Sequence, residues 1–259
     1  MKIPLLILIA VTLMVLSTTM VVSHYKKNSG IIYLALTLLI TSLEIIMSTA
    51  FLTWGNTSKT GLILLNFNML SFLKGPFIYF FVRSYTTNTT SIRLKDSWHF
   101  LLSGIQFLLL FPSYYLLSYD EKLVATDWML NSYIQYMNTS GYPFEIMWNT
   151  DLRAFSMWIY TIVSFIMFVS HYRSLRTSSP KEQWPLYRWL LVVMAILLAL
   201  SSFYIVSLLI FILFKDFAWF YTFLKQSEQW LLIVFLFIPF ILIIQPGLVY
   251  FRPDRSTSS

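Results

Sequence analysis

The sequence has no cysteine, few glycines and few charged residues for its length. Its 259 residues include 7 Gly, and only 11% of the residues are charged against 58% that are hydrophobic. Without cysteine the chain can form no disulfide and no thiolate metal site. A soluble domain carries roughly a quarter of its residues as charged side chains, so this chain cannot cover a water-facing surface. The composition predicts an integral membrane protein.

Long apolar runs predict an all-α polytopic membrane protein rather than a barrel. The runs are too long for the alternating strands of an outer-membrane barrel, which leaves helices as the spanning structure. A window of about 19 residues identifies seven segments, each near the ~20 residues that cross a bilayer. They are residues 3–23, 30–54, 62–85, 98–118, 154–172, 188–214 and 229–250. We therefore expect one seven-transmembrane-helix bundle domain over residues 1–250 and a short cytoplasmic tail over 251–259. The first segment has no signal-peptide cleavage site after it and is expected to be retained.

The distribution of Lys and Arg predicts the direction of the bundle. Of 18 such residues, eleven fall on the side of the first, third and fifth connections and the tail, six fall on the other side, and Lys74 lies within a span. Positive residues favour the cytoplasm, so the N-terminus is predicted outside and the C-terminus inside, in a bacterial inner (cytoplasmic) membrane. The inner side would then face anionic lipid headgroups.

The longest connection, residues 119–153, lies on the predicted outer side. Its apolar residues between 123 and 137 recur at helical spacing. This pattern predicts a short surface helix. It would pack against the spans or the headgroups, and the alternative is a lid over an outward pocket.

Two charged residues of opposite sign fall deep within predicted spans. Glu44 lies midway along 30–54, and Lys74 lies midway along 62–85. A charge at such a depth costs at least ~2.5 kcal/mol and faces the bundle interior, so the two residues are predicted to form an ion pair. The pair is either structural or part of a ligand or coupling site. Asn66 and Asn68 would add polar groups to that pocket.

The residues after Lys74 predict a bend in the third span. Gly75 and Pro76 are poor interior helix residues, and a proline there kinks a helix. The hypothesis is a hinge, and its alternative is a static kink that lets the span pack. Aromatic and basic residues near the inner interface are predicted to anchor the bundle there. They are Tyr79, Phe81, Arg83, Trp98 and Trp189.

Catalytic and metal motifs give little support to other functions. His24, His99 and His171 all fall at predicted cytoplasmic helix ends, and three imidazoles can bind zinc. No local ligand motif accompanies them, so no metal site and no cofactor are predicted. There is no nucleophile motif and no paired-carboxylate motif. Residues 229–250 contain no lysine that could hold retinal. We do not expect an enzyme.

Two adjacent blocks resemble a known family. The sequences GPFIYFFVRSY (75–85) and RLKDSWHFL (93–101) resemble the membrane-spanning N-terminal sensory domain of bacterial AraC-type (helix-turn-helix) transcriptional regulators. YRWL at 187–190 and QPGLVY at 245–250 are also similar to that family. The matching residues of the two blocks are Gly75, Pro76, Tyr79, Phe81, Val82, Arg83, Ser84, Lys95, Asp96, His99 and Phe100.

The resemblance implies a sensory and signal-transducing module. The family continues beyond its seventh span into a cytoplasmic DNA-binding domain, which this sequence does not contain. The module is expected to detect an extracytoplasmic or intramembrane signal and to pass it to a cytoplasmic output partner or domain absent from this chain. The resemblance also implies a homodimer. Direct nucleic acid binding by this chain is not expected. The alternative is a small transporter or channel with Glu44 and Lys74 in its pathway, which the lack of internal repeats disfavours.

Overall fold

A computed structural model of the chain describes residues 2–24, 30–54, 69–87, 89–110, 116–124, 127, 144–178 and 184–214. Within those ranges every regular element is a helix, which confirms the all-α prediction. The longer elements are α1 (Lys2–His24), α2 (Ile31–Trp54), α4 (Lys74–Thr87), α5 (Leu101–Leu110), α7 (Phe144–Ser178) and α8 (Trp184–Phe214). Two 3₁₀-helices, η1 (Met69–Leu73) and η2 (Leu94–Phe100), lead directly into α4 and α5.

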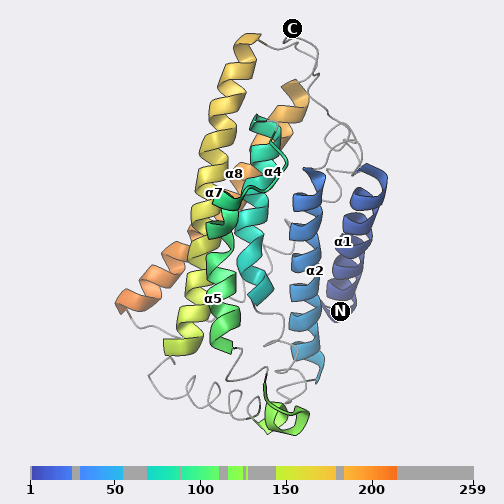
Figure 1. Cartoon of the computed structure of the whole chain (residues 1–259), viewed down its shortest axis with the longest axis vertical. Helices are drawn as coiled ribbons and strands as arrows, with labels where there is room; N and C mark the ends of the chain where they lie inside the picture. The colour runs from blue at the N-terminus through green and yellow to red at the C-terminus, as the bar shows by residue number, and fades with distance from the viewer. Residues whose placement is uncertain are drawn as a thin grey trace.

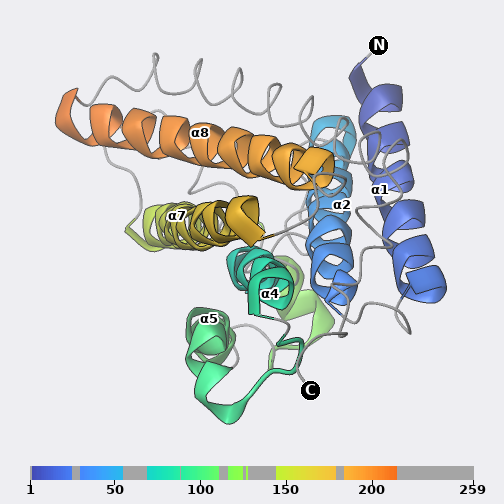
Figure 2. The same ribbon diagram turned by 90° about the horizontal axis from the view of Figure 1, so that it is seen from above.

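The helices pack side by side with α4 at the centre. Figure 1 shows α1, α4 and α7 running upward and α2 and α5 running downward, and Figure 2 shows α4 between α2 and α7. α1 packs on α2, α2 on α4, α4 on α7, and α7 on α8. α5 packs mainly on η1 and η2 and lies at the edge of this arrangement. Each of α2, α4 and α7 therefore has a helix on two sides.

Two apolar clusters hold the helices together. The larger one surrounds α4, where Phe80 and Val82 are fully buried and pack with Phe168 of α7 and Met194 of α8. The smaller one lies between α1 and α2. There, the Ser17 hydroxyl donates a 2.8 Å hydrogen bond to the Ala35 carbonyl, and the Ser42 hydroxyl donates a 2.7 Å hydrogen bond to the Ala10 carbonyl. Small hydroxyl residues at helix contacts are typical of bundles that pack in lipid.

The helix bounds agree with most of the predicted spans and correct two of them. α1 and α2 match segments 3–23 and 30–54 to within one residue at each end, and α8 begins four residues before 188 and ends at 214. α7 begins at Phe144, so residues 144–153, which were assigned to the outer connection, are helical instead. A hydropathy window ends where polar residues begin, whereas a helix continues through them because its backbone bonds do not depend on hydropathy.

The other segments are described in part. Residues 116–118 form a turn, so the fourth predicted segment runs too far at its C-terminal end. Residues 119–124 are helical, which is the described part of the expected surface helix. Residues 62–68, 229–250 and the tail lie outside the described residues.

The outward faces of several helices are apolar. Among the described residues one helix, Leu152–Ser174, is long and apolar enough to cross a membrane. Shorter apolar stretches occupy Leu6–Val22, Ile31–Met47 and Leu190–Phe203. On α7 the exposed large side chains recur at helical spacing. These side chains are Phe155, Ile159, Val163 and Ile166.

Candidate functional site

The predicted ion pair between Glu44 and Lys74 is confirmed. The Lys74 Nζ atom lies 2.5 Å from Oε2 of Glu44, and the two side chains are 18% and 24% exposed. Glu44 comes from α2, and Lys74 is the first residue of α4. The pair therefore joins the two helices where their backbones approach each other. Its role in a ligand site remains a prediction.

Two more polar residues border this pair from other helices. Ser71 of η1 lies beside Glu44, and the charge of Arg153 on α7 also acts on that carboxylate. The Ser71 hydroxyl is buried and meets no hydrogen-bond partner among the described residues. The predicted pocket residues Asn66 and Asn68 lie outside the described residues. Polar or charged side chains of η1, α4 and α7 therefore all act on the Glu44 carboxylate of α2.

The break in the third span takes a different form from the predicted kink. The 3₁₀-helix η1 gives way to α4 at Lys74, so Pro76 lies in the first turn of an α-helix. In that turn the missing proline N–H costs no helical hydrogen bond. The expected kink within one continuous helix is therefore replaced by a helix start. Whether the junction moves as a hinge remains a prediction.

Gly75 has a packing role that sequence reasoning missed. A Cβ atom added at Gly75 would lie 2.7 Å from Cδ2 of Tyr160 and 3.1 Å from its Cβ. Non-bonded carbon atoms do not approach as closely as 2.7 Å. Only glycine therefore lets α4 lie this close to the Tyr160 ring of α7. Tyr160 is thereby fixed against the first turn of α4.

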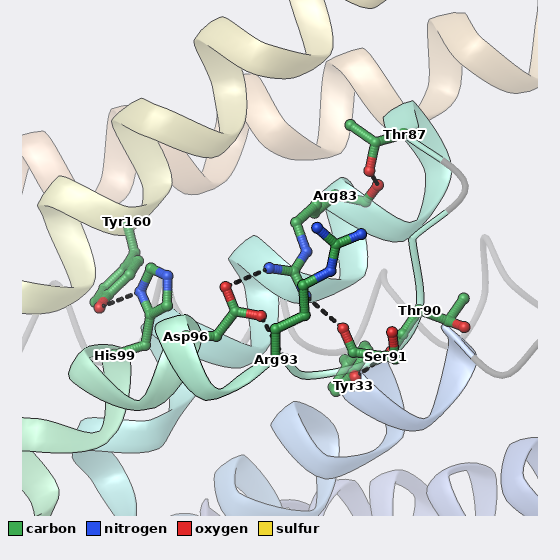
Figure 3. A network of polar contacts seen from close by, with 9 residues as sticks. All are labelled: Tyr33, Arg83, Thr87, Thr90, Ser91, Arg93, Asp96, His99 and Tyr160. Atoms are coloured by element: carbon green, nitrogen blue, oxygen red, sulfur yellow. Dashed lines mark hydrogen bonds and ion pairs between the residues drawn. The ribbon is translucent and has the colours of Figure 1, made fainter.

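A second ion pair lies at the other end of α4 (Figure 3). Nη1 of Arg83 lies 2.9 Å from Oδ1 of Asp96, and the two side chains are only 10% and 7% exposed. Nη2 of Arg83 also donates a 3.0 Å hydrogen bond to the Ser91 carbonyl, and the guanidinium carbon lies 4.7 Å from the centre of the Phe80 ring. Arg83 therefore ties the connection after α4 back onto the helix.

Further contacts extend this pair to α2 and α7. The Tyr33 hydroxyl of α2 donates a hydrogen bond to the Thr90 carbonyl. Nδ1 of His99 and the Tyr160 hydroxyl lie 2.8 Å apart, with donor and acceptor set by the histidine tautomer. The five side chains that make these contacts are called the end network below. They are Tyr33, Arg83, Asp96, His99 and Tyr160.

The carboxyl group of Asp96 is ionised at neutral pH. Burial alone would raise the pKa of Asp96, but the Arg93 backbone N–H, at 2.8 Å from Oδ2, and the Arg83 guanidinium favour the charged form. The net effect places the pKa of Asp96 below its usual value. The end network is thus built around a permanent buried charge pair.

The predicted interface anchors separate into two groups. Phe81 and Arg83 are buried, and Tyr79 is half-buried, whereas Trp98 is exposed. The side chain of Trp189 lies outside the described residues. Arg83 turns inward rather than toward headgroups because Asp96 offers it a counter-ion. A sequence signal for this pair existed, since Asp96 is the only acid between residues 91 and 110 and both residues belong to the blocks that resemble the regulator family.

The three histidines do not form a cluster that the structure shows. Among the described residues no three His, Asp or Glu side chains are grouped to hold a metal ion. His99 contacts Tyr160, and the centre of its ring lies 4.8 Å from the ring centre of Tyr79 and 3.8 Å from that of Trp98. His171 is half-buried on α7, and the side chain of His24 is outside the described residues.

Comparisons with known proteins identify no relative. No protein-family model matches the chain, and no curated protein and no solved structure shows a significant match to it. The resemblance to membrane-spanning regulators thus stays a prediction from the sequence.

Proposed function

We propose that the protein is a membrane-embedded sensory module that passes an extracytoplasmic or intramembrane signal to a cytoplasmic output. One observation carries this proposal: α4 bears an ion pair at each end. Lys74 opens the helix in contact with Glu44, and Arg83 holds the end network. The two residues are separated by about 13 Å along the helix axis. A displacement of the first turn of α4 is therefore transmitted along a rigid element to the network.

The proposed setting is a seven-helix bundle with the N-terminus outside and the C-terminus inside. The directions of α1, α2, α4, α5 and α7, which alternate in chain order in Figure 1, support it. So do the exposed apolar side chains of α1, α7 and α8, which would be costly in water and suit lipid. In this setting the end network lies at the cytoplasmic end, close to any output partner.

The route of the signal follows from the contacts. An event that separates Lys74 from Glu44 leaves two uncompensated charges in an apolar region, which favours a different position of the α4 start. Gly75 contacts the Tyr160 ring, and the Tyr160 hydroxyl contacts His99. A shift at Gly75 therefore reaches η2 through one side chain. Two discrete arrangements of these contacts would form the two states that a signal biases.

The proposal is tested by a single reporter in the full chain. Because the protein contains no cysteine, Ser91→Cys with a spin label gives one signal, from an exposed position whose carbonyl accepts the Arg83 bond. The chain is reconstituted in liposomes, and Glu44→Gln imitates release of the pair. We expect a changed label mobility, with Glu121→Gln as the control that removes an exposed carboxylate. An unchanged spectrum in both variants would reduce the pair to a structural role.

The transporter alternative has a separate readout. If Glu44 and Lys74 line a pathway, the reconstituted wild-type chain conducts protons or small ions and Glu44→Gln abolishes the flux. A sensory module shows no flux in either form. Measurements with a pH-sensitive dye and with radioactive Na⁺ in the same liposomes decide between the two functions.

A further inference from the structure

An exposed apolar stripe runs along η2 and α5. Leu94 is 91% exposed and Trp98 is 62% exposed, and three more large side chains are exposed on α5. In α5 the spacing of four and three residues places Leu101, Ile105 and Leu108 on one side of the α-helix. Leu94 and Trp98 precede them on η2, a 3₁₀-helix with about three residues per turn. The stripe consists of Leu94, Trp98, Leu101, Ile105 and Leu108. α5 packs on η1, where the Ser103 hydroxyl donates a 3.0 Å hydrogen bond to the Met69 carbonyl, and these five side chains stay exposed among the described residues.

A glycine interrupts this stripe. Gly104 is exposed, and a Cβ atom added there would meet nothing within 4 Å. It lies on the same helix face as Leu101, Ile105 and Leu108. The absence of a side chain leaves the backbone of Gly104 open between larger apolar groups.

Within residues 91–100 the exposed charged side chains are all positive. Arg93 and Lys95 are exposed on either side of Leu94. Asp96, the only acid between residues 91 and 110, is turned inward to Arg83 and is almost fully buried. The end network thus removes the single negative charge from this surface.

We propose that this surface binds an anionic phospholipid, with the lipid phosphate at Arg93 and Lys95 and one acyl chain along the stripe over Gly104. The inference rests on the proposed membrane setting, in which η2 lies at the headgroup level and α5 enters the hydrocarbon. Tryptophan beside basic residues is typical of that depth. A second copy of the chain fits less well, because a two-fold contact would place the same basic residues of both copies against each other.

Lipid binding at this place also acts on the end network. η2 is held on the bundle by the Asp96–Arg83 pair and the His99–Tyr160 contact. A phosphate beside Arg93 and Lys95 lies on the outer side of the same short helix. The charge of the surrounding lipid therefore becomes a regulator of the site through which the proposed signal leaves the membrane.

The test uses Ser97→Cys, an exposed position between the basic residues and Trp98. The full chain is labelled there with a fluorophore and reconstituted with nitroxide-bearing phosphatidylglycerol or phosphatidylcholine of identical acyl chains. We expect phosphatidylglycerol to quench at several-fold lower mole fraction. Each basic side chain contributes up to roughly fivefold to such a preference. Arg93→Gln with Lys95→Gln should abolish the preference, whereas Arg173→Gln, an exposed arginine on α7, should leave it unchanged.

The remaining outcomes separate the site from its setting. Equal quenching by both lipids in the wild-type chain would overturn the anionic site and leave the membrane placement intact. No quenching by either lipid would overturn both the anionic site and the membrane placement of this surface. Dipolar coupling between spin labels at Ser97 of two chains, with both lipids excluded, would show that a second copy occupies the stripe instead.

Discussion

The two ion pairs of α4 differ in how they are enclosed. Arg83 and Asp96 are about one-tenth exposed or less, and the backbone of Ser91 and Arg93 supplies further hydrogen bonds to them. Glu44 and Lys74 are about one-fifth exposed, and their described hydrogen bonding is a single contact between the two side chains. The first pair fastens a connection to the bundle. The second pair is held by fewer contacts, and in the proposed sensory function it is the contact that a signal changes.

The largest loss of stability is expected at the Arg83–Asp96 pair, which is called the enclosed pair below. Asp96→Ala leaves the Arg83 charge buried without its carboxylate, which typically costs about 3–5 kcal/mol. The free energy of unfolding should fall by that order in chemical denaturation in mixed micelles. Adding Arg83→Met should recover a large part of the loss because the lone charge is then removed. If the single and double variants were equally unstable, the pair would not be the source of the effect.

A smaller loss of stability is expected at the Glu44–Lys74 pair, which is called the open pair below. Glu44→Gln should destabilise the protein less than Asp96→Ala, because Lys74 is less enclosed than Arg83. Glu44→Gln combined with Lys74→Met should be more stable than Glu44→Gln alone. The same denaturation series measures all three proteins. A larger loss at Glu44 than at Asp96 would reverse the assignment of structural and responsive pair.

The third prediction compares two glycines. Gly75→Ala forces a Cβ atom against the Tyr160 ring and should cost about 1–3 kcal/mol, as other overpacked contacts do. Gly104→Ala meets open space and should stabilise α5 by up to ~1 kcal/mol through helix propensity. Gly75→Ala with Tyr160→Leu tests the contact directly, since removing the ring should relieve the overpacking. An equal effect of alanine at both glycines would contradict the close contact.

Acid should weaken the enclosed pair by a smaller amount, because protonation leaves the Asp96 side chain in place. The pKa of Asp96 is lower in the folded protein than the usual value of about 3.9. Its contribution is therefore fully present above about pH 4 and is lost as the pH falls through the folded-state pKa. Thermal unfolding of the wild type and Asp96→Asn between pH 7 and pH 2 should show a stability difference that shrinks only below pH 4. A constant difference would contradict the linkage.

The sequence predicted the long apolar helices and the ion pair within predicted spans, but it did not predict the ion pair between charges near segment ends. Hydropathy located α1, α2 and α8 because each of them coincides with a long apolar run of the sequence. The Glu44–Lys74 contact was predictable because two charges deep in apolar segments must compensate each other. Arg83 and Asp96 lie near predicted segment ends, where a charge is inexpensive, so nothing in their positions required them to pair.

The start of α4 shows the same limit for backbone and aromatic residues. Gly75 and Pro76 fit both a kink and a helix start, and only the η1 helix before them decides between the two. Tyr160 is an uncharged residue within an apolar run, which is an ordinary place for tyrosine. Its contacts with Gly75 and His99 depend on how α4 and α7 pack against each other, and the sequence of neither helix alone predicts that packing.

The smallest expected effect concerns the link between the two regions. Tyr160→Phe removes the hydroxyl that contacts His99 but keeps the ring that packs on Gly75. Loss of one such hydrogen bond should cost about 1 kcal/mol, so the protein should still fold. If Tyr160 carries the displacement from the open pair to the enclosed one, the Ser91 label should no longer respond to Glu44→Gln in this background. Thr161→Ser on the same helix is the control, because its hydroxyl bonds the Met157 carbonyl within α7. A label response that survives Tyr160→Phe would show that α4 alone transmits the change, as a rigid body.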